Sequence, residues 1–238
     1  MLCKVKGSVF MKKNKIKLSI LFNSLIVLLA LFVCFMIITG FKIDNGVEPR
    51  VMLASTGFGA FKFFTVDSNL FLTIVACIFI VYDCKLLAGK IKTIPKWLMI
   101  LKYVATVSVG VTFFTVFLYL GWVAEGGMIS LLRNSNLFLH LIMPVLAFIT
   151  FLFFDDIKLE SKHIIYGLIP LFVYSIYYGI NGLAHMKNGI IPLEFDIYGF
   201  LQDGLLKAVI VLVVVFIGNY IISYGLYKIK LMILEDNK

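Results

Sequence analysis

A threonine and a histidine stand out in this chain because each lies near the start of a long apolar segment. Thr65 opens the sequence Thr-Val-Asp-Ser68-Asn69, and His140 lies four residues before Pro144. A hydroxyl within reach of an imidazole forms a nucleophile–base pair, in which the imidazole takes the hydroxyl proton as the oxygen attacks. The unperturbed pKa of histidine, about 6.5, suits that task. Thr65 and His140 are therefore the candidate catalytic residues.

Small and polar residues follow one another at helical spacing after the threonine. They are Thr65, Ser68, Asn69, Thr73 and Ala76. This spacing puts them along one face of a helix, and in lipid such a face should turn toward other helices. Two interpretations stay open: helix packing, which small and hydroxylated residues favour, and a functional surface. On the second, Ser68 and Asn69 are the candidate substrate-binding or oxyanion donors.

The histidine precedes a proline at the spacing that disturbs a helix. A proline removes the hydrogen-bond partner of the carbonyl four residues earlier, which here belongs to His140. The pair therefore predicts a kink that places an imidazole beside a free carbonyl. Two alternatives stay open: Pro144 in the first turn of its helix, where it costs nothing, and His140 in contact with lipid headgroups.

The composition indicates which elements position these residues. Of the 238 residues, 61% are hydrophobic and 15% charged, whereas about a quarter of a soluble domain is charged. We expect an all-α polytopic membrane protein, a six-transmembrane-helix bundle that forms a single domain over residues 1–238, because about 20 apolar residues span a bilayer. The expected spans are residues 18–40, 63–82, 97–121, 137–154, 164–180 and 205–227.

The basic residues predict the orientation of these spans. In the six-span arrangement, 15 lysines fall in the tails and loops on the side of the termini, against 6 lysines and arginines on the other side. We expect a multi-pass protein of the cell membrane, and the positive-inside rule then places both termini in the cytoplasm. Thr65 and His140 fall at one depth near the extracytoplasmic side. The net charge of +9 is explained by this asymmetry, and no nucleic-acid partner is expected.

Other polar groups are expected to have ordinary roles. Asp83 and Lys102 lie near the inner edge, where they can snorkel or be solvated, and too few acidic residues lie inside the membrane for a proton or cation relay. Tyr177 and Tyr178 are typical of an interfacial belt. Asp203, before the last span, is either solvated or orients an imidazole. The sequence has no motif for a metal or an organic cofactor, and we expect neither.

Five short segments, in order, resemble segments of the FAR/androgen-induced-like integral membrane proteins. They are Phe61-Lys-Phe-Phe-Thr-Val-Asp-Ser-Asn-Leu70, His140-Leu-Ile-Met-Pro144, Phe153-Phe-Asp155, Tyr166-Gly-Leu-Ile-Pro-Leu-Phe-Val-Tyr174 and Pro192-Leu-Glu-Phe-Asp196. The resemblance covers the second to the sixth span. It implies six spans with both termini inside, in agreement with the charge asymmetry.

The resemblance also implies an activity. Animal members of that family are similar to threonine hydrolases, which cleave fatty acid esters of hydroxy fatty acids with an intramembrane threonine and histidine. By position these roles fall on Thr65 and His140, and the expected partner is a membrane lipid or fatty-acyl ester substrate. The resemblance does not fix the substrate. The alternative is a non-catalytic membrane protein that binds or transports a small lipid or amphiphile.

Overall fold

The computed structural model describes residues 2–45, 57–123, 126–155, 158–192, 194–201 and 205–236, and over these residues the chain is helical and contains no strand. The α-helices are α1 (Leu2–Thr39), α2 (Phe64–Leu87), α3 (Lys96–Thr115), α4 (Gly121–Val123), α5 (Gly127–Leu131), α6 (Asn134–Leu137), α7 (Met143–Ile149), α8 (His163–Tyr166), α9 (Ile169–Ala184) and α10 (Leu205–Asp236). A 3₁₀ helix, η1 (Gly57–Lys62), and three π-helices, η2 (Val116–Leu120), η3 (Phe138–Ile142) and η4 (Thr150–Phe154), complete the set.

Six helical segments of the described chain are long and apolar enough to cross a membrane, which confirms the predicted fold class. They are Lys13–Thr39, Phe64–Leu87, Lys96–Leu120, Asn134–Phe154, His163–Ala184 and Leu206–Glu235. The third joins α3 to η2, the fourth runs through α6, η3, α7 and η4, and the fifth joins α8 to α9. The last span continues well beyond the expected end at residue 227.

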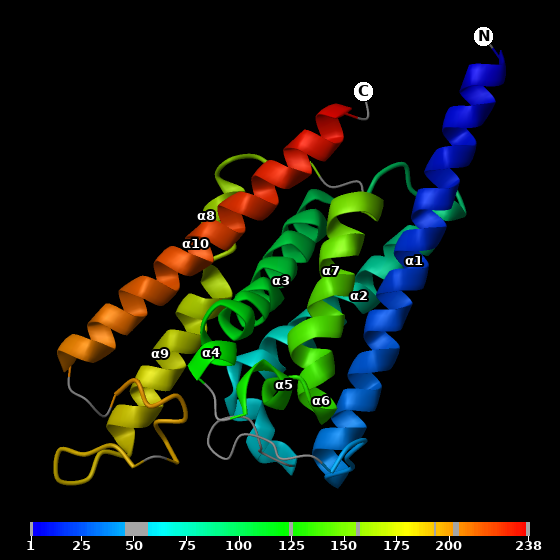
Figure 1. The fold of residues 1–238 in the computed structure, drawn as a ribbon. Helices are drawn as coiled ribbons and strands as arrows, with labels where there is room; N and C mark the ends of the chain where they lie inside the picture. Colours follow the sequence, from blue (N-terminus) through cyan, green and yellow to red (C-terminus); the bar gives the residue numbers. More distant parts are fainter. Residues whose placement is uncertain are drawn as a thin grey trace.

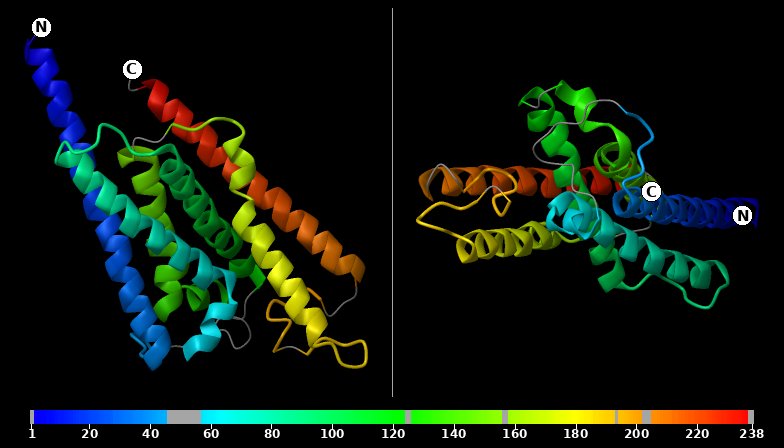
Figure 2. Two further views of the ribbon diagram at one scale, coloured as in Figure 1. Left: turned by 180° about the vertical axis from the view of Figure 1, so that it is seen from behind. Right: turned by 90° about the horizontal axis from the view of Figure 1, so that it is seen from below.

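The spans form one bundle in which neighbouring helices alternate in direction. The start of α1 and the end of α10 lie at the same end, called here the terminal end (Figure 1). α2 packs between α1 and α3, and α10 contacts α3, α8 and η4. The view from below shows α9 and α10 on one side of the bundle and α1 and α2 on the other (Figure 2). α3 is the most buried of the six spans, and α10 is the least buried.

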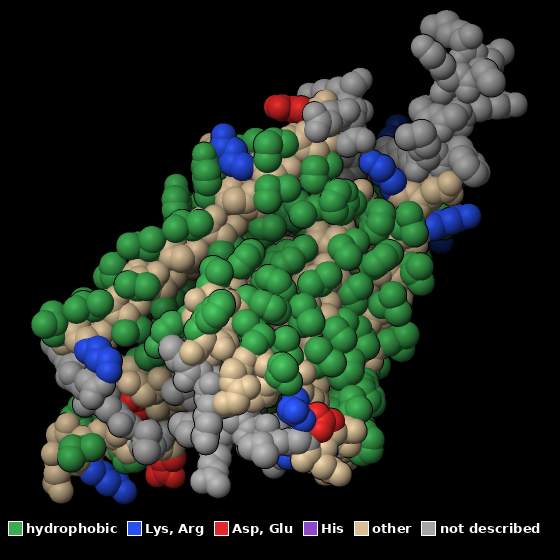
Figure 3. Space-filling view, viewed as in Figure 1, with side chains coloured by type: hydrophobic (Ala, Val, Ile, Leu, Met, Phe, Trp, Pro, Cys, Tyr) green, Lys and Arg blue, Asp and Glu red, His purple; other side chains and the backbone are tan. Residues whose placement is uncertain are grey.

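Two local features show why the chain breaks its helices where it does. Gly89 has a φ of +72°, a left-handed conformation that commonly ends a helix, and it follows the last residues of α2. Pro170 lies in the first turn of α9, after a short turn at Gly167 and Leu168 that separates it from α8. On the face shown in Figure 3, hydrophobic side chains cover the middle of the bundle and the charged ones lie toward its two ends, as expected for a bundle with lipid around its middle.

Candidate functional site

Thr65 lies at the start of the second span, at the end of the bundle opposite the termini. It is the second residue of α2, and the extended backbone of Phe63 joins this helix to η1. Its side chain is 8% exposed and makes no hydrogen bond with the described residues. The hydroxyl is therefore free of the helix, unlike that of Thr73, which donates to the carbonyl of Asn69 at 2.7 Å.

His140 lies in the middle of the π-helix η3 and is 2% exposed. The alternative in which His140 contacts lipid headgroups is therefore wrong, because the ring is enclosed by protein. Pro144 lies inside the continuous helical run from Asn134 to Phe154, so the disturbance predicted from its missing N–H takes the form of a wider π turn. Neither ring nitrogen of His140 has a hydrogen-bond partner among the described residues.

The amide of Asn69 joins the two helices that carry these residues. Its Nδ2 donates to the carbonyl of Thr65 at 2.8 Å and to the carbonyl of Leu139 at 3.1 Å. Leu139 is the neighbour of His140, so η3 lies beside the first turn of α2. The two segments are in contact through Asn69 and Leu139, and the common depth of Thr65 and His140 stays a prediction. Direct pairing is not seen, because the ring of His140 makes no hydrogen bond to Thr65.

The predicted polar face of α2 turns inward. Thr65, Ser68, Asn69, Thr73 and Ala76 are all buried. Ser68 Oγ donates to the carbonyl of Thr65 at 3.1 Å, and both N–H groups of Asn69 are engaged by carbonyls. In this state neither residue has a free donor for an oxyanion, so their assignment as oxyanion donors stays a prediction. Asn69 Oδ1, an acceptor, has no partner among the described residues.

A small recess at this end of the bundle is lined in part by Thr65. Its cavity volume is about 20 Å³, which is room for roughly one water molecule. Its lining residues are Ile37, Ala60, Phe63, Thr65, Val66, Ser135, Asn136 and Leu139. Ser135 and Asn136 are polar members that the sequence did not single out as site residues; Asn136 lies one helical turn before His140, a spacing that shares a helix face. His140 is not among the residues that line the recess, although its neighbour Leu139 is.

The last loop at this end covers the start of α2. The hydroxyl of Tyr198 accepts a hydrogen bond from the backbone N–H of Phe64 at 3.1 Å, and its ring packs edge-on against Phe63. Burial raises the pKa of Tyr198. The loop is fixed by Asp196, whose carboxylate accepts hydrogen bonds from the backbone N–H groups of Phe200 and Leu201, each at 3.0 Å.

Tyr178 also holds this loop, since its hydroxyl donates to Asp196. It is buried, so its expected place in an interfacial belt is wrong, whereas Tyr177 is exposed. Asp203, the candidate for orienting an imidazole, lies outside the described residues.

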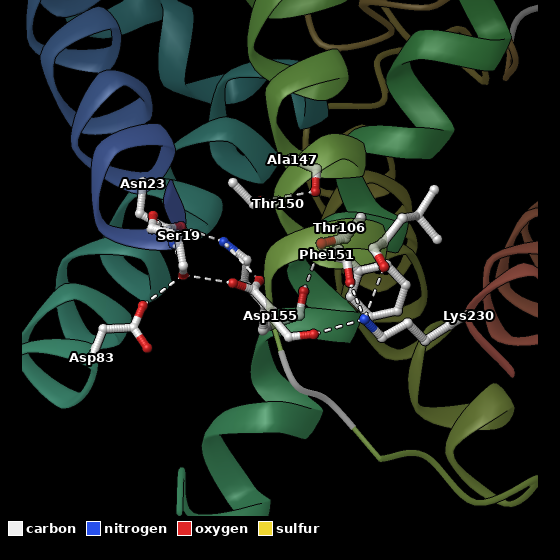
Figure 4. A network of polar contacts seen from close by, with 11 residues as sticks. Ser19, Asn23, Asp83, Thr106, Ala147, Thr150, Phe151, Asp155 and Lys230 are labelled. Carbon is white, nitrogen blue, oxygen red and sulfur yellow. Dashed lines mark hydrogen bonds and ion pairs between the residues drawn. The ribbon is translucent and has the colours of Figure 1, made fainter. Parts of the chain in front are cut away.

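The terminal end contains a group of buried charges that the sequence did not predict. Asp83 and Lys102 are 3% and 0% exposed, so the expectation that they snorkel or are solvated is wrong. With Ser19, Asn23 and Asp155 they form what we call the terminal cluster, which joins α1, α2, α3 and the residue after η4 (Figure 4). The partners in each of these contacts lie more than fifty residues apart in the chain, except for Asn23 and Ser19.

Lys230 of α10 fixes the same region from the other side. Its ammonium donates to the carbonyls of Phe151 at 2.7 Å, Leu152 at 3.0 Å and Asp155 at 2.7 Å. These carbonyls belong to the end of η4, where helical partners are missing and a positive charge is favourable.

Comparison with protein-family models, with curated proteins and with solved structures finds no match. Within the described residues, no three histidine, cysteine, aspartate or glutamate side chains lie together as a metal site.

Proposed function

We propose that the recess is the site of a lipid-ester hydrolase, with Thr65 as nucleophile and His140 as base. The observation that carries this proposal is the buried imidazole of His140, which has no protein partner on either nitrogen among the described residues and lies beside the helix turn that presents the unengaged Thr65 hydroxyl. A buried polar group without a partner is costly, and a substrate or water that completes its hydrogen bonds removes that cost.

The reaction would proceed in two balanced steps. Thr65 Oγ1 attacks the carbonyl carbon of an ester while His140 takes its proton, and the proton passes to the departing alkoxide, which leaves as an alcohol. Water then attacks the acyl-threonine with His140 again as base, and the acid is released. The resemblance to the FAR/androgen-induced-like proteins supports these roles and a fatty-acyl ester as substrate. The charge asymmetry supports a position near the extracytoplasmic side.

The apolar lining of the recess supports a lipid as ligand. Ile37 of α1, Phe63 and Val66 bring side chains without charge to the opening, while Thr65, Ser135 and Asn136 supply hydroxyl and amide groups. A mixture of apolar wall and few polar groups is typical of small-molecule sites. The recess has a cavity volume of about 20 Å³, so a lipid ester enters only when the surrounding helices move apart.

A second candidate function is binding of a lipid or amphiphile without turnover. It is favoured by the engaged donors of Ser68 and Asn69 and by the absence of a hydrogen bond between Thr65 and the ring of His140. In this function Thr65 and His140 would each hydrogen-bond to the ligand headgroup.

Covalent labelling with a fluorophosphonate separates the two functions. The hydrolase predicts that the wild type is labelled and that Thr65→Ala and His140→Ala are not, whereas His185→Ala, which alters the exposed histidine beyond α9, and Thr73→Ala label normally. The binding function would be supported instead if the folded wild type is never labelled and cleaves no fatty-acyl ester, yet binds a fluorescent lipid less tightly after Thr65→Ala.

A further inference from the structure

The terminal cluster lies far from the recess, and the proposed function does not use it. Asp83 is eighteen residues after Thr65 on α2, which corresponds to about 27 Å along the helix. The ionisable members of the cluster, Asp83, Lys102 and Asp155, are each at most 3% exposed. Ionisable groups enclosed in a membrane bundle are expensive to bury and are commonly functional.

The hydrogen bonds around Ser19 show that the cluster is short of one proton when both acids are ionised. Ser19 Oγ lies 2.5 Å from Asp83 Oδ2 and 2.8 Å from Asp155 Oδ1 (Figure 4). A hydroxyl has one proton to donate, and an ionised carboxylate can only accept. Two ionised carboxylates would therefore leave one of these close oxygen pairs without a hydrogen between its atoms.

Asn23 cannot supply the missing proton. Its Nδ2 donates to the carbonyl of Ser19 at 2.9 Å and to Ser19 Oγ at 3.2 Å, and its Oδ1 accepts from Lys102. The two lone pairs of Ser19 Oγ can thus receive one N–H from Asn23 and one further donor. Every short oxygen–oxygen contact of Ser19 Oγ contains a hydrogen only when that further donor is a protonated carboxyl.

The lysines determine which carboxyl carries the proton. Lys102 Nζ lies 3.7 Å from Asp155 Oδ2, and Lys230 donates to the main-chain carbonyl of Asp155. The positive charges therefore gather at Asp155 and favour its ionised form. Asp83 has Ser19 as its side-chain hydrogen-bond partner in the described chain.

We propose that the terminal cluster is a proton-binding site, in which protonated Asp83 donates to Ser19 Oγ and Ser19 donates to ionised Asp155. Release of the proton to water would leave a second carboxylate facing Ser19 and break the link from α2 to α1. The titratable and charged groups that face the site are Asp83 from α2, Lys102 from α3, Asp155 after η4 and Lys230 from α10; α1 contributes the uncharged Ser19 and Asn23.

A metal cation is a poor alternative occupant. The ammonium of Lys102 already takes the position that a cation would need, because it donates to Asn23 Oδ1, lies near Asp155 and sits 5.3 Å from the ring centre of Phe79. The proton site holds together the ends of several spans, so its occupancy sets how firmly the terminal end is closed.

Infrared spectroscopy of the purified full chain in lipid vesicles tests the proposal. We expect a carbonyl stretch of a protonated carboxylic acid at neutral pH, which shifts when the aspartates carry ¹³C and disappears in Asp83→Asn. The same component should persist in the matched controls Asp67→Asn, on the same helix, and Glu235→Gln, an exposed acid at the same end. Absence of such a band in the folded wild type, or its survival in Asp83→Asn, would overturn the proposal.

Thermal unfolding provides a second readout that does not depend on assigning a band. The amide of Asp83→Asn can donate to Ser19 as the acid does, so this variant should melt near the wild-type temperature at neutral pH. The melting temperature of the wild type should fall as the pH rises from about 4 toward the folded-state pKa of Asp83, because Asp83 holds a proton in the folded protein and releases it on unfolding. The melting temperature of Asp83→Asn should change less over the same range. If the melting temperature of the wild type rises or stays constant between about pH 4 and neutral pH, and Asp83→Asn melts well below the wild type at neutral pH, then Asp83 is an ionised partner and the proton site is refuted.

Discussion

Among the polar residues near Thr65, Asn69 is the one whose side-chain amide donates hydrogen bonds to two different helices. Both of its N–H groups donate to buried carbonyls, those of Thr65 on its own helix and Leu139 on η3. A carbonyl inside a helix that loses its partner through a wider π turn needs another donor. Asn69 therefore fixes the level at which the histidine helix meets α2, and His140 takes its position from this bond.

Replacement of Asn69 by leucine should destabilise the protein more than removal of a neighbouring hydroxyl. The Asn69→Leu variant leaves the Leu139 carbonyl buried without its donor, which costs about 1–3 kcal/mol. Thr73→Val is the matched control, since the hydrogen-bond partner of Thr73 Oγ1 among the described residues is a carbonyl of its own helix, and loss of this bond costs about 1 kcal/mol or less. Thermal unfolding in the same detergent compares them; equal melting temperatures would show that the Asn69 link does not hold η3 in place.

The helices that carry the two candidate residues differ in regularity. α2 is an uninterrupted α-helix, whereas the fourth span changes to a π-helix around His140 and again at η4. A π turn inserts an extra residue into the helix and rotates the side chains after it, and such turns are frequent at functional sites. Pro144 favours this irregular form because a regular helix would leave its missing N–H opposite the His140 carbonyl.

Pro144→Ala tests whether the π turn positions His140. With an N–H restored, η3 should close to a regular α-helix, and His140 should turn away from the Thr65 helix. We expect fluorophosphonate labelling to slow by roughly tenfold to a hundredfold, with melting temperature unchanged or raised because a helix-interior proline is removed. Pro170→Ala is the control, since Pro170 lies in the first turn of α9. Unchanged labelling with altered hydrogen exchange over residues 138–144 would contradict a positioning role.

The sequence predicted the elements better than it predicted the contacts of their charged residues. Long apolar runs identify spans because the bilayer thickness sets their length, and the spacing from Thr65 to Ala76 correctly indicated an inward face. Lys230 shows the limit: next to exposed Lys228, it looks like the start of a basic tail, yet it bonds to carbonyls 75 to 79 residues away. Hydropathy cannot distinguish a lysine that snorkels from one that caps another helix, because the difference lies in the packing of distant segments.

At the scale of the whole molecule, the charges outside the membrane differ from the buried ones in their dependence on pH. Glu160, in the loop before the fifth span, forms ion pairs with Lys162 and Lys96 and joins this loop to the start of α3. The two lysines lower the pKa of Glu160 from 4.5 to about 2. A carboxyl with a lowered folded-state pKa contributes stability above its unfolded pKa and loses it as the pH falls toward the folded value.

Glu160→Gln should therefore flatten the acid side of the stability curve. Between about pH 5 and pH 2.5, the melting temperature of the wild type should fall further than that of Glu160→Gln, and the difference should shrink in high salt because the pairs are exposed and screened. Thermal unfolding at several pH values with and without salt gives this comparison. If the melting temperature of Glu160→Gln fell further at acid pH than that of the wild type, the predicted role of the Glu160 ion pairs would be contradicted.

The two ends of the bundle are distinguished by their charges, and this leads to a prediction of orientation. The start of α1 and the end of α10 share one end, and 15 lysines of the tails and loops fall on that side against 6 basic residues on the other. The predicted orientation places the terminal end in the cytoplasm.

Single cysteines, introduced into a background in which Cys3, Cys34, Cys77 and Cys84 are replaced by serine, test this orientation. Glu235→Cys should react with a membrane-impermeant maleimide only after lysis, and Met186→Cys, in the loop beyond α9, should react in intact cells. The reverse pattern would turn the bundle over and place the recess on the cytoplasmic side, where a substrate would have to enter from the inner leaflet.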